Sequence, residues 1–216
     1  MPEDRALPPE VEGGEATERM LQILSTSARL FATAGYEGTS MRDIAQACGI
    51  SKSLLYHHFA DKDEIFARIT LGSTRELVQF VEARLPEGAT ASARLRAFMV
   101  ATGEYFQRYR WAWIASTTAF WNDPQQRRHA ERMLWRDRYE GLVRSLIQQA
   151  IAAGEIRPLD VPLAGRLVLS SLNWMHRWHK PDQGMPAPEV AAEYFDMIFS
   201  GLRADGQGLP PGHPEG

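Results

Sequence analysis

Residues 51–66, SKSLLYHHFADKDEIF, bring lysine, serine, tyrosine and histidine side chains together in one short stretch. Lysine neutralises phosphate, hydroxyl groups hydrogen-bond to phosphate oxygens, and histidine can do either. At 100° per residue, Ser53, Tyr56 and His57 centre on one helix face, and Leu55 falls on the opposite face. The stretch is therefore predicted to be a helix with an apolar inner side and an outer side suited to nucleic acid.

Further polar groups extend this outer side. Lys52 and Leu54 flank it, and His58 lies at its boundary. Lys62, in the first turn of the next helix, adds a cation where backbone N–H groups also point outward. Arg42, on the preceding short helix, has the reach to form two hydrogen bonds with guanine O6 and N7. A pair of short helices with this chemistry fits the major groove of DNA, which admits one helix.

Several of these residues have a second interpretation that needs no DNA. Ser40 and Ser51 are good helix N-caps in any case, so a phosphate contact would be an additional role. Tyr56 also fits the edge of a core, and His58 also fits a packed histidine. Cys48 is interpreted as a small buried residue of the turn.

Apolar spacing and capping residues predict the helices that carry these side chains. A first helix over about 17–34 has one apolar stripe and ends at Gly35, and Ser40 with Asp43 begins a short second helix. Asp61 begins a long helix that is expected to reach Leu85. Later helices are expected from Asp123–Pro124 to Gly154, over 161–178, and from Pro188 to Gly201.

The predicted fold is all-α, with about nine helices. Residues 16–62 form a three-helix DNA-binding domain with a helix-turn-helix, and residues 63–203 form a helical bundle for ligand binding and dimerisation. Residues 1–15 and 204–216 are rich in proline, glycine and acids and are expected to be flexible tails.

Composition restricts the class of protein. The 216 residues are 44% hydrophobic and 24% charged, with a net charge of −3. Residues 19–62 nevertheless carry five bases against three acids, while residues 1–18 carry six acids against one base. One cysteine, no long apolar run and an acidic N-terminus favour a cytoplasmic protein that is not associated with a membrane.

An enzyme is the competing class of protein. A possible set of metal ligands is formed by His57, His58, Asp61 and Glu64. However, the two histidines point 100° apart around the helix, and Asp61 fits a helix cap. The sequence contains no nucleophile elbow, phosphate-binding loop or dinucleotide motif. No catalytic residue, metal or cofactor is therefore predicted, and the chain is expected not to be an enzyme.

Residues 105–121, YFQRYRWAWIASTTAFW, concentrate aromatic side chains. They fit core packing and equally fit a wide aromatic pocket for a ligand. Near the C-terminus, two tryptophans share a face at i, i+4, beside a cluster of His176, Arg177, His179 and Lys180. These charges fit either a solvated surface or a phosphate site. The candidate ligand-binding residues are Tyr105, Tyr109, Trp113, Phe120, Trp121, Trp174, Arg177 and Trp178.

The segment AGYEGTSMRDIAQACGISKSLLYHHFADKDEIF resembles the N-terminal domain of the TetR family of transcriptional repressors, and it includes the core G-(I/V)-S-K-x-x-L-Y-x-H-F-x-x-K. This resemblance implies an N-terminal helix-turn-helix, a helical ligand-binding body and a homodimer made by the last two long helices. It assigns DNA contacts to Ser40, Arg42, Ser51, Lys52, Ser53, Tyr56, His57, His58 and Lys62. Leu54 stands where many members have a small or hydroxyl residue, and it either meets a thymine methyl group or limits the approach.

The segment LNWMHRWHKPDQGMPAPEVAAEYFDMIFSGL resembles the C-terminal domain of the KstR-type subgroup, although His179–Lys180 replaces the aromatic–arginine pair that is more usual there. The resemblance implies an effector related to lipid or aromatic catabolism, and several members respond to coenzyme A thioesters. The function predicted is a repressor that binds a near-palindromic DNA operator and is released by an apolar effector, with an acyl-CoA thioester as the first choice. A multidrug-sensing repressor and a helical ligand-binding protein without a DNA function are the alternatives.

Overall fold

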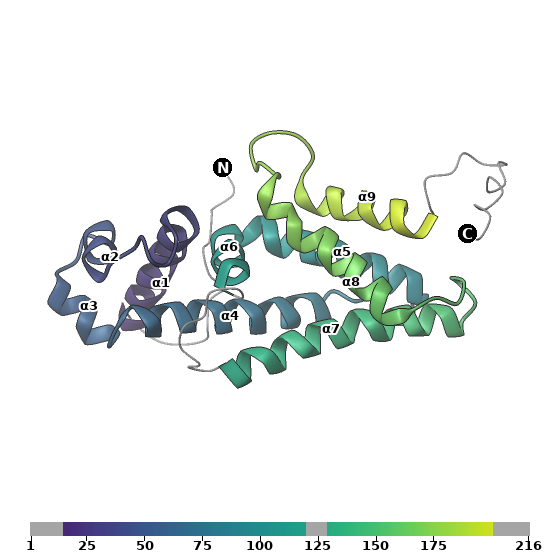
Figure 1. Cartoon of the computed structure of the whole chain (residues 1–216), viewed down its shortest axis with the longest axis horizontal. Helices are drawn as coiled ribbons and strands as arrows, with labels where there is room; N and C mark the ends of the chain where they lie inside the picture. Colours follow the sequence, from purple (N-terminus) through teal and green to yellow (C-terminus); the bar gives the residue numbers. More distant parts are fainter. Residues whose placement is uncertain (1–14, 120–128, 201–216) are drawn as a thin grey trace, which may run out of the picture.

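The computed structural model describes residues 15–119 and 129–200, and in these ranges the protein is all-α, as predicted. Figure 1 shows a small group of N-terminal helices beside a larger helical bundle. The described part has nine α-helices and one short 3₁₀-helix, η1, and it has no strand. The helices are α1 Glu15–Ala34, α2 Met41–Ala47, α3 Lys52–His58, α4 Lys62–Glu82, α5 Ala91–Arg108, α6 Arg110–Ala119, α7 His129–Ala152, α8 Val161–Asn173, η1 Trp174–Arg177 and α9 Ala187–Ser200.

The N-terminal core is assembled from the apolar faces of short helices. Ile23, Ala28 and Phe31 of α1 are buried against Ile44 of α2 and Leu55 of α3, as the helical spacing predicts. Cys48 is buried in the same core, and its burial raises the pKa of the thiol. Because α2 and α3 have only seven residues each, their stability depends on this shared packing more than on their own hydrogen bonds.

Helix α4 joins the two parts of the molecule. Its first half buries Ile65 and Ile69 in the N-terminal core. Its second half buries Leu77 and Val81 in the core of the larger bundle, and we call this bundle the body. Figure 1 shows α4 running from the N-terminal group of helices into the body. Helix α4 therefore contributes to both cores.

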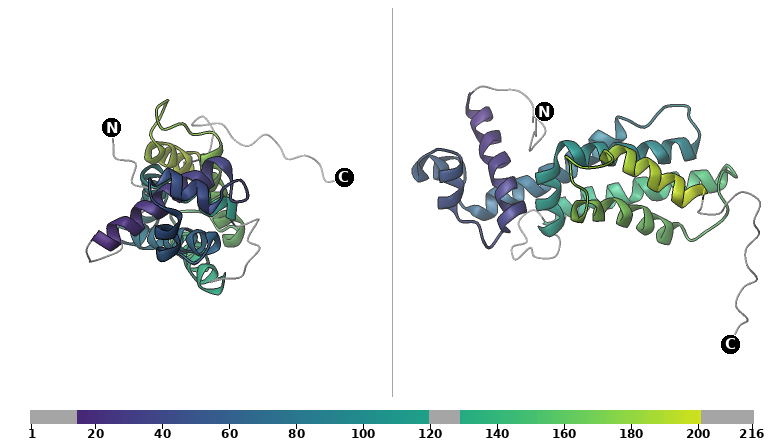
Figure 2. Two further views of the ribbon diagram at one scale, coloured as in Figure 1. Left: turned by 90° about the vertical axis from the view of Figure 1, so that its left-hand side faces the viewer. Right: turned by 90° about the horizontal axis from the view of Figure 1, so that it is seen from above.

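The body packs α5 against α9 on one side and α4 against α7 on the other. The contact between α5 and α9 is close because Gly103 faces the backbone at the start of α9. A Cβ atom added at Gly103 would lie 2.5 Å from the carbonyl oxygen of Ala187. Figure 2, seen from above, shows α8 and α9 running along the same side of the body.

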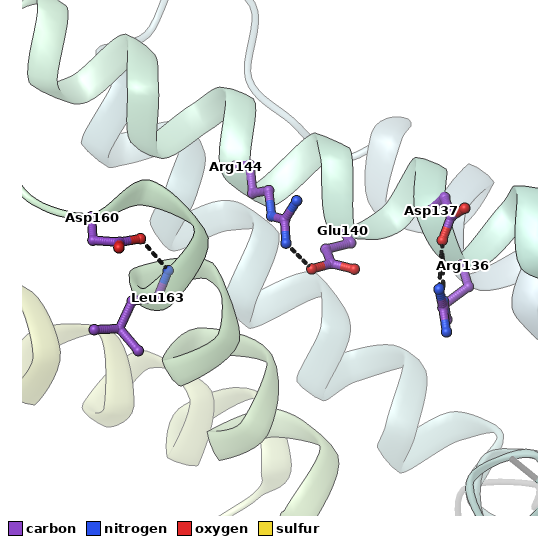
Figure 3. A network of polar contacts seen from close by, with 6 residues as sticks. All are labelled: Arg136, Asp137, Glu140, Arg144, Asp160 and Leu163. Atoms are coloured by element: carbon purple, nitrogen blue, oxygen red, sulfur yellow. Dashed lines mark hydrogen bonds and ion pairs between the residues drawn. The ribbon is translucent and has the colours of Figure 1, made fainter.

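Polar contacts within α7 and at the start of α8 stabilise these two helices (Figure 3). The Asp160 carboxylate accepts a hydrogen bond from the Leu163 backbone N–H at 2.8 Å and thereby caps α8. On α7, Arg144 forms an ion pair with Glu140 one turn away, and Arg136 pairs with the adjacent Asp137. The cap sets where α8 starts, and so sets which of its residues face outward.

Some sequence expectations fall outside the described residues. These are the two tails, the Asp123–Pro124 helix start, and the aromatic side chains of Phe120 and Trp121. Within residues 15–119 and 129–200, no helix is long and apolar enough to cross a membrane. The same residues contain no group of three or more acidic, histidine or cysteine side chains placed to hold a metal ion.

Candidate DNA interface and effector site

Two side-chain caps hold α2 and α3 in place. The Ser40 hydroxyl accepts from the Asp43 backbone N–H at 3.2 Å, and the Asp43 carboxylate accepts from the Ser40 N–H at 2.9 Å, which completes a capping box. Hydrogen bonds from the Ser40 side chain and then from its backbone lower the pKa of Asp43. Gly49, at φ +64°, makes the turn, and the Ser51 hydroxyl accepts from the Leu54 N–H at 3.1 Å to begin α3.

Helix α3 separates its apolar and polar residues as the sequence predicts. Leu55 is fully buried and Phe59, which ends the helix, is 1% exposed. The outer side carries Lys52, Ser53, Leu54, Tyr56 and His57, which are exposed, and His58, which is half-buried. Tyr56 is 46% exposed, so it does not cover the core edge. The helix thus presents one continuous polar and aromatic surface, and contact of its residues with DNA stays a prediction.

Lys62 makes contacts inside the protein, whereas Arg42 lies exposed at the surface. The Lys62 ammonium donates to the Tyr36 carbonyl oxygen at 2.8 Å and lies 4.1 Å from the centre of the Tyr36 ring. One of its three N–H groups is therefore used inside the protein, and the others remain for a phosphate. Arg42 is exposed on α2, on the same end of the molecule as α3.

Helix α6 contributes to both cores. Ala112 and Ala115 are fully buried in the N-terminal core, where α6 packs on α1 and α4. Trp113, between them, is buried in the body core. Helix α5 ends at Tyr109, where φ is −123° and ψ is 41°, and α6 begins at the next residue. The break lets α6 turn away from α5 and contact both halves of the protein.

The predicted aromatic residues of α5 and α6 do come together in the body. Tyr105, Tyr109 and Trp113 are all buried, and the Tyr105 ring lies 4.8 Å from that of Tyr109 and 6.4 Å from that of Trp113. The Tyr105 hydroxyl donates to the Ser73 carbonyl oxygen at 2.9 Å. Burial raises the pKa of Tyr105, so its side chain stays neutral. These residues form an apolar interior with hydroxyl groups held inside it.

A second buried hydroxyl pair lies in the same core. The Tyr139 hydroxyl of α7 is 2.6 Å from the Thr102 hydroxyl of α5, and burial raises the pKa of Tyr139 as well. The Tyr139 ring stacks on Phe98 at 4.9 Å. This pair was not predicted from the sequence, because no local pattern brings residues 37 positions apart into contact.

Trp174, Arg177 and Trp178 lie apart from this interior, at the surface. Trp174 is 64% exposed and Trp178 is 48% exposed, and the Arg177 guanidinium lies 5.6 Å from the Trp174 ring. His179 was grouped with the cations of this segment, but the structure corrects that placement. His179 is 4% exposed, and its Nε2 lies 3.0 Å from the Met185 carbonyl oxygen.

Ring contacts connect the surface residues to the interior. Trp178 contacts His179 at 5.9 Å, and His179 contacts Phe106 of α5 at 5.7 Å. Phe106 in turn contacts Trp113 of α6 at 5.7 Å. Phe106 and His179, which were not among the candidate residues, therefore join the two groups that were.

Two family descriptions match this chain. "Bacterial regulatory proteins, tetR family" matches residues 23–69, and "Tetracyclin repressor-like, C-terminal domain" matches residues 88–202, which is more than half of the chain. The transcriptional repressor KstR2 of Mycobacterium tuberculosis is 26% identical over 206 residues, covering 89% of this chain and 97% of that protein. Its structure, that of a ketosteroid transcriptional regulator, has 25% identity and a TM-score of 0.80, and it covers 90% of this chain and 96% of that one.

Two further solved structures are similar over nearly their whole length. PfmR, a TetR family transcriptional regulator from Thermus thermophilus, is 41% identical with a TM-score of 0.79, covering 84% of this chain and 99% of that chain. AibR, solved in complex with isovaleryl coenzyme A and operator DNA, is 29% identical with a TM-score of 0.70, covering 85% of this chain and all of that chain.

Proposed function

The chain belongs to the tetR family of bacterial regulatory proteins, and from this premise we propose that it is a ligand-responsive repressor released from its operator by an acyl-CoA thioester. Membership makes it a DNA-binding regulator of transcription, related to the KstR2 repressors, and not an enzyme. The operator, the dimer and the effector belong to the proposal.

The observation that carries the proposal is the position of α6 and α4 in both cores. The surface of α3 is fixed through Leu55 to the N-terminal core, and that core includes Ala112 and Ala115 of α6. The same helix carries Trp113 into the aromatic interior of the body. A ligand that displaces Trp113 would move α6 against α1 and α4 and change the placement of α3.

The dimer proposal rests on an exposed apolar face of α8. Leu163 is 62% exposed and Leu167, one turn later, is 55% exposed, although both are large hydrophobic residues. Met197 on the adjacent α9 is 48% exposed. Ser171, one further turn along α8, is half-buried and donates to the Val168 carbonyl oxygen. Two copies paired on α8 and α9 would bury the face in a four-helix interface.

A dimer would present two copies of α3 about one DNA turn apart, roughly 34–36 Å, which predicts a near-palindromic operator. Relief of repression by about 100-fold requires a coupling free energy of about 2.7 kcal/mol between ligand and DNA. A small tilt of α4 is sufficient, because the spacing of the two recognition helices must match the groove at both half-sites.

The acyl-CoA proposal is supported by chemistry and by a relative. AibR was solved with isovaleryl coenzyme A and operator DNA together. In this chain, Arg177 and Lys180 are exposed cations next to Trp174 and Trp178, which offer stacking surfaces for an adenine ring. The aromatic interior offers an apolar environment for the acyl group.

A multidrug-sensing repressor is the second candidate function. Buried Tyr105, Tyr109 and Trp113 favour it, because an uncharged lipophile needs only such an interior. Arg177 would then have no role in ligand response. A comparison of acyl-CoA thioesters with uncharged lipophiles separates the two candidates.

The DNA function is tested by a gel shift with the DNA upstream of the chain's own gene. We expect a salt-sensitive complex at nanomolar protein, competed by a near-palindromic segment and not by unrelated DNA. Sedimentation in the same buffer should give a dimer at micromolar concentration. Failure to bind any upstream DNA would favour a helical ligand-binding protein, and a stable monomer would contradict the dimer.

A further inference from the structure

Several buried side-chain nitrogen atoms have no hydrogen-bond partner among the described residues, and two of them belong to ring side chains that contact Phe106 in the body. They are the indole Nε1 of Trp113 and the ring Nδ1 of His179. Each side chain belongs to a residue that is only 4% exposed. Buried polar groups in folded proteins are almost always hydrogen-bonded, so two orphaned groups in one core require an explanation.

The two groups have opposite hydrogen-bonding roles. Trp113 Nε1 carries a hydrogen and can only donate. His179 Nε2 lies 3.0 Å from the Met185 carbonyl oxygen, which can only accept, so this contact assigns the tautomer whose N–H is at Nε2. His179 Nδ1 is consequently an acceptor. One group requires an acceptor and the other requires a donor.

The side chains of both groups contact one ring. Phe106 is fully buried, and its ring centre is 5.7 Å from that of Trp113 and 5.7 Å from that of His179. Arg110, at the start of α6, holds the arrangement. Its Nη2 donates to the His179 carbonyl oxygen at 2.8 Å, and its guanidinium lies 5.1 Å from the Phe106 ring. The site is thus built from α5, α6 and the segment before α9.

A ligand with a plain alkyl chain leaves both groups unsatisfied. A hydroxyl group accepts from one neighbour and donates to another, so an oxygenated ligand satisfies one or both groups. We propose that Trp113 and His179 are the polar anchors of the effector site, and that they select ligands carrying a hydroxyl group within the apolar part. This inference rests on the proposed function to the extent that the body holds the effector.

The binding test uses matched ligands. Dodecanoyl-CoA is compared with 3-hydroxydodecanoyl-CoA and 12-hydroxydodecanoyl-CoA, and 1-methylnaphthalene is compared with 1-naphthol, by calorimetry on the full chain. We expect at least one hydroxylated ligand to bind about 3- to 10-fold more tightly than its plain counterpart, the gain typical of one or two neutral hydrogen bonds.

Two conservative variants remove one group each. Trp113→Phe keeps an aromatic ring and deletes the N–H. His179→Gln keeps an N–H for the Met185 carbonyl oxygen and deletes the ring acceptor. Each should bring the ratio of the affinities for the hydroxylated and the plain ligand close to one, whatever its effect on the affinity for the plain ligand itself. Leu134→Ala, at an exposed position of α7, is the surface control and should leave the preference unchanged.

Each outcome has a defined meaning. A preference seen with the naphthalene pair and lost in Trp113→Phe, with no binding of any thioester, supports the anchors and contradicts the acyl-CoA proposal. Thioesters that release DNA equally well with and without the hydroxyl group contradict the anchors and leave the proposed function standing. If no ligand binds, both are wrong. A preference that survives in both variants also overturns the assignment.

Discussion

The N-terminal domain and the body differ in where their polar side chains lie and in how far away their partners are in the sequence. In the N-terminal domain the important polar groups lie at the surface and are fixed by partners three residues away, as in Ser40 with Asp43 and Ser51 with Leu54. In the body, Tyr105 pairs with Ser73, 32 residues away, and both are buried. A substitution of a surface polar residue in the N-terminal domain should therefore leave the fold intact. A substitution of a buried polar residue in the body also changes the packing of the core.

The largest effect should come from the core of the N-terminal domain. Phe59 is 1% exposed, and Phe59→Ala should lower the free energy of unfolding of that domain by about 3–5 kcal/mol. Tyr56→Ala, on the outer side of the same helix, should change stability by less than about 0.5 kcal/mol and still weaken operator binding. Denaturant unfolding and DNA binding, measured on both variants, check this. Equal stability losses would contradict the division into inner and outer sides.

The next effect concerns the exposed end of the body. Arg177→Ala should raise the acyl-CoA concentration needed for release by roughly 10- to 150-fold, because a charge-assisted hydrogen bond contributes about 1.5–3 kcal/mol. Binding of the ligand-free protein to DNA should be unchanged, since Arg177 lies in η1, which packs on the body core through Met175, whereas α3 packs in the N-terminal core. The matched control is Arg157→Ala, another exposed arginine. Identical titrations for both variants would remove Arg177 from the effector site.

Two basic residues of the DNA interface should behave differently from each other. Arg42→Ala should cost about 1–3 kcal/mol of binding and relax sequence preference, because arginine reads guanine. Lys62→Ala should weaken binding to all sequences and reduce the salt slope by about one. Lys62→Ala should also lower stability, since its ammonium donates to the Tyr36 carbonyl oxygen. Salt titrations on operator and random DNA test both, and two variants that bind as the wild type would disprove the interface.

The smallest effects are expected for the helix caps Ser40 and Ser51. The loss of stability on replacing each should depend on pH for Ser40 and not for Ser51. Ser51→Ala should cost about 0.5–2 kcal/mol at any pH, because no carboxylate takes part. Ser40 lowers the pKa of Asp43 below its usual value of 3.8. That contribution is complete above this value and is lost as pH falls through the lowered pKa, so Ser40→Ala should be less destabilising in acid than at neutral pH. Unfolding curves at neutral pH and near pH 3 measure it, and a cost for Ser40→Ala that does not change with pH would be contrary to this account.

The N-terminal domain was predictable because its signals are local. The caps at Ser40 and Ser51 and the apolar spacing of Leu55 and Phe59 lie within a few residues of the helices they define. The same reasoning found Tyr105, Tyr109 and Trp113 but could not decide between core and ligand site, since both require aromatic residues. The structure shows them buried and leaves their contact with a ligand as a prediction.

The body contains features that depend on contacts between distant segments. His179 looked like part of a charged cluster, and its burial follows from Phe106, which lies 73 positions earlier in the chain (179 minus 106). The outward face of α8 carries large apolar residues. The cap at Asp160 fixes the start of that helix, and Leu163 and Leu167 then face outward.

The central claim is that one polypeptide binds operator DNA through α3 and releases it when a ligand occupies the body. It is tested most directly by the fluorescence anisotropy of labelled operator DNA titrated with protein, with and without a saturating acyl-CoA. We predict salt-sensitive binding of a dimer, and an affinity that falls by about 100-fold with ligand. An operator affinity that is identical with and without an acyl-CoA that demonstrably binds the protein would contradict the claim.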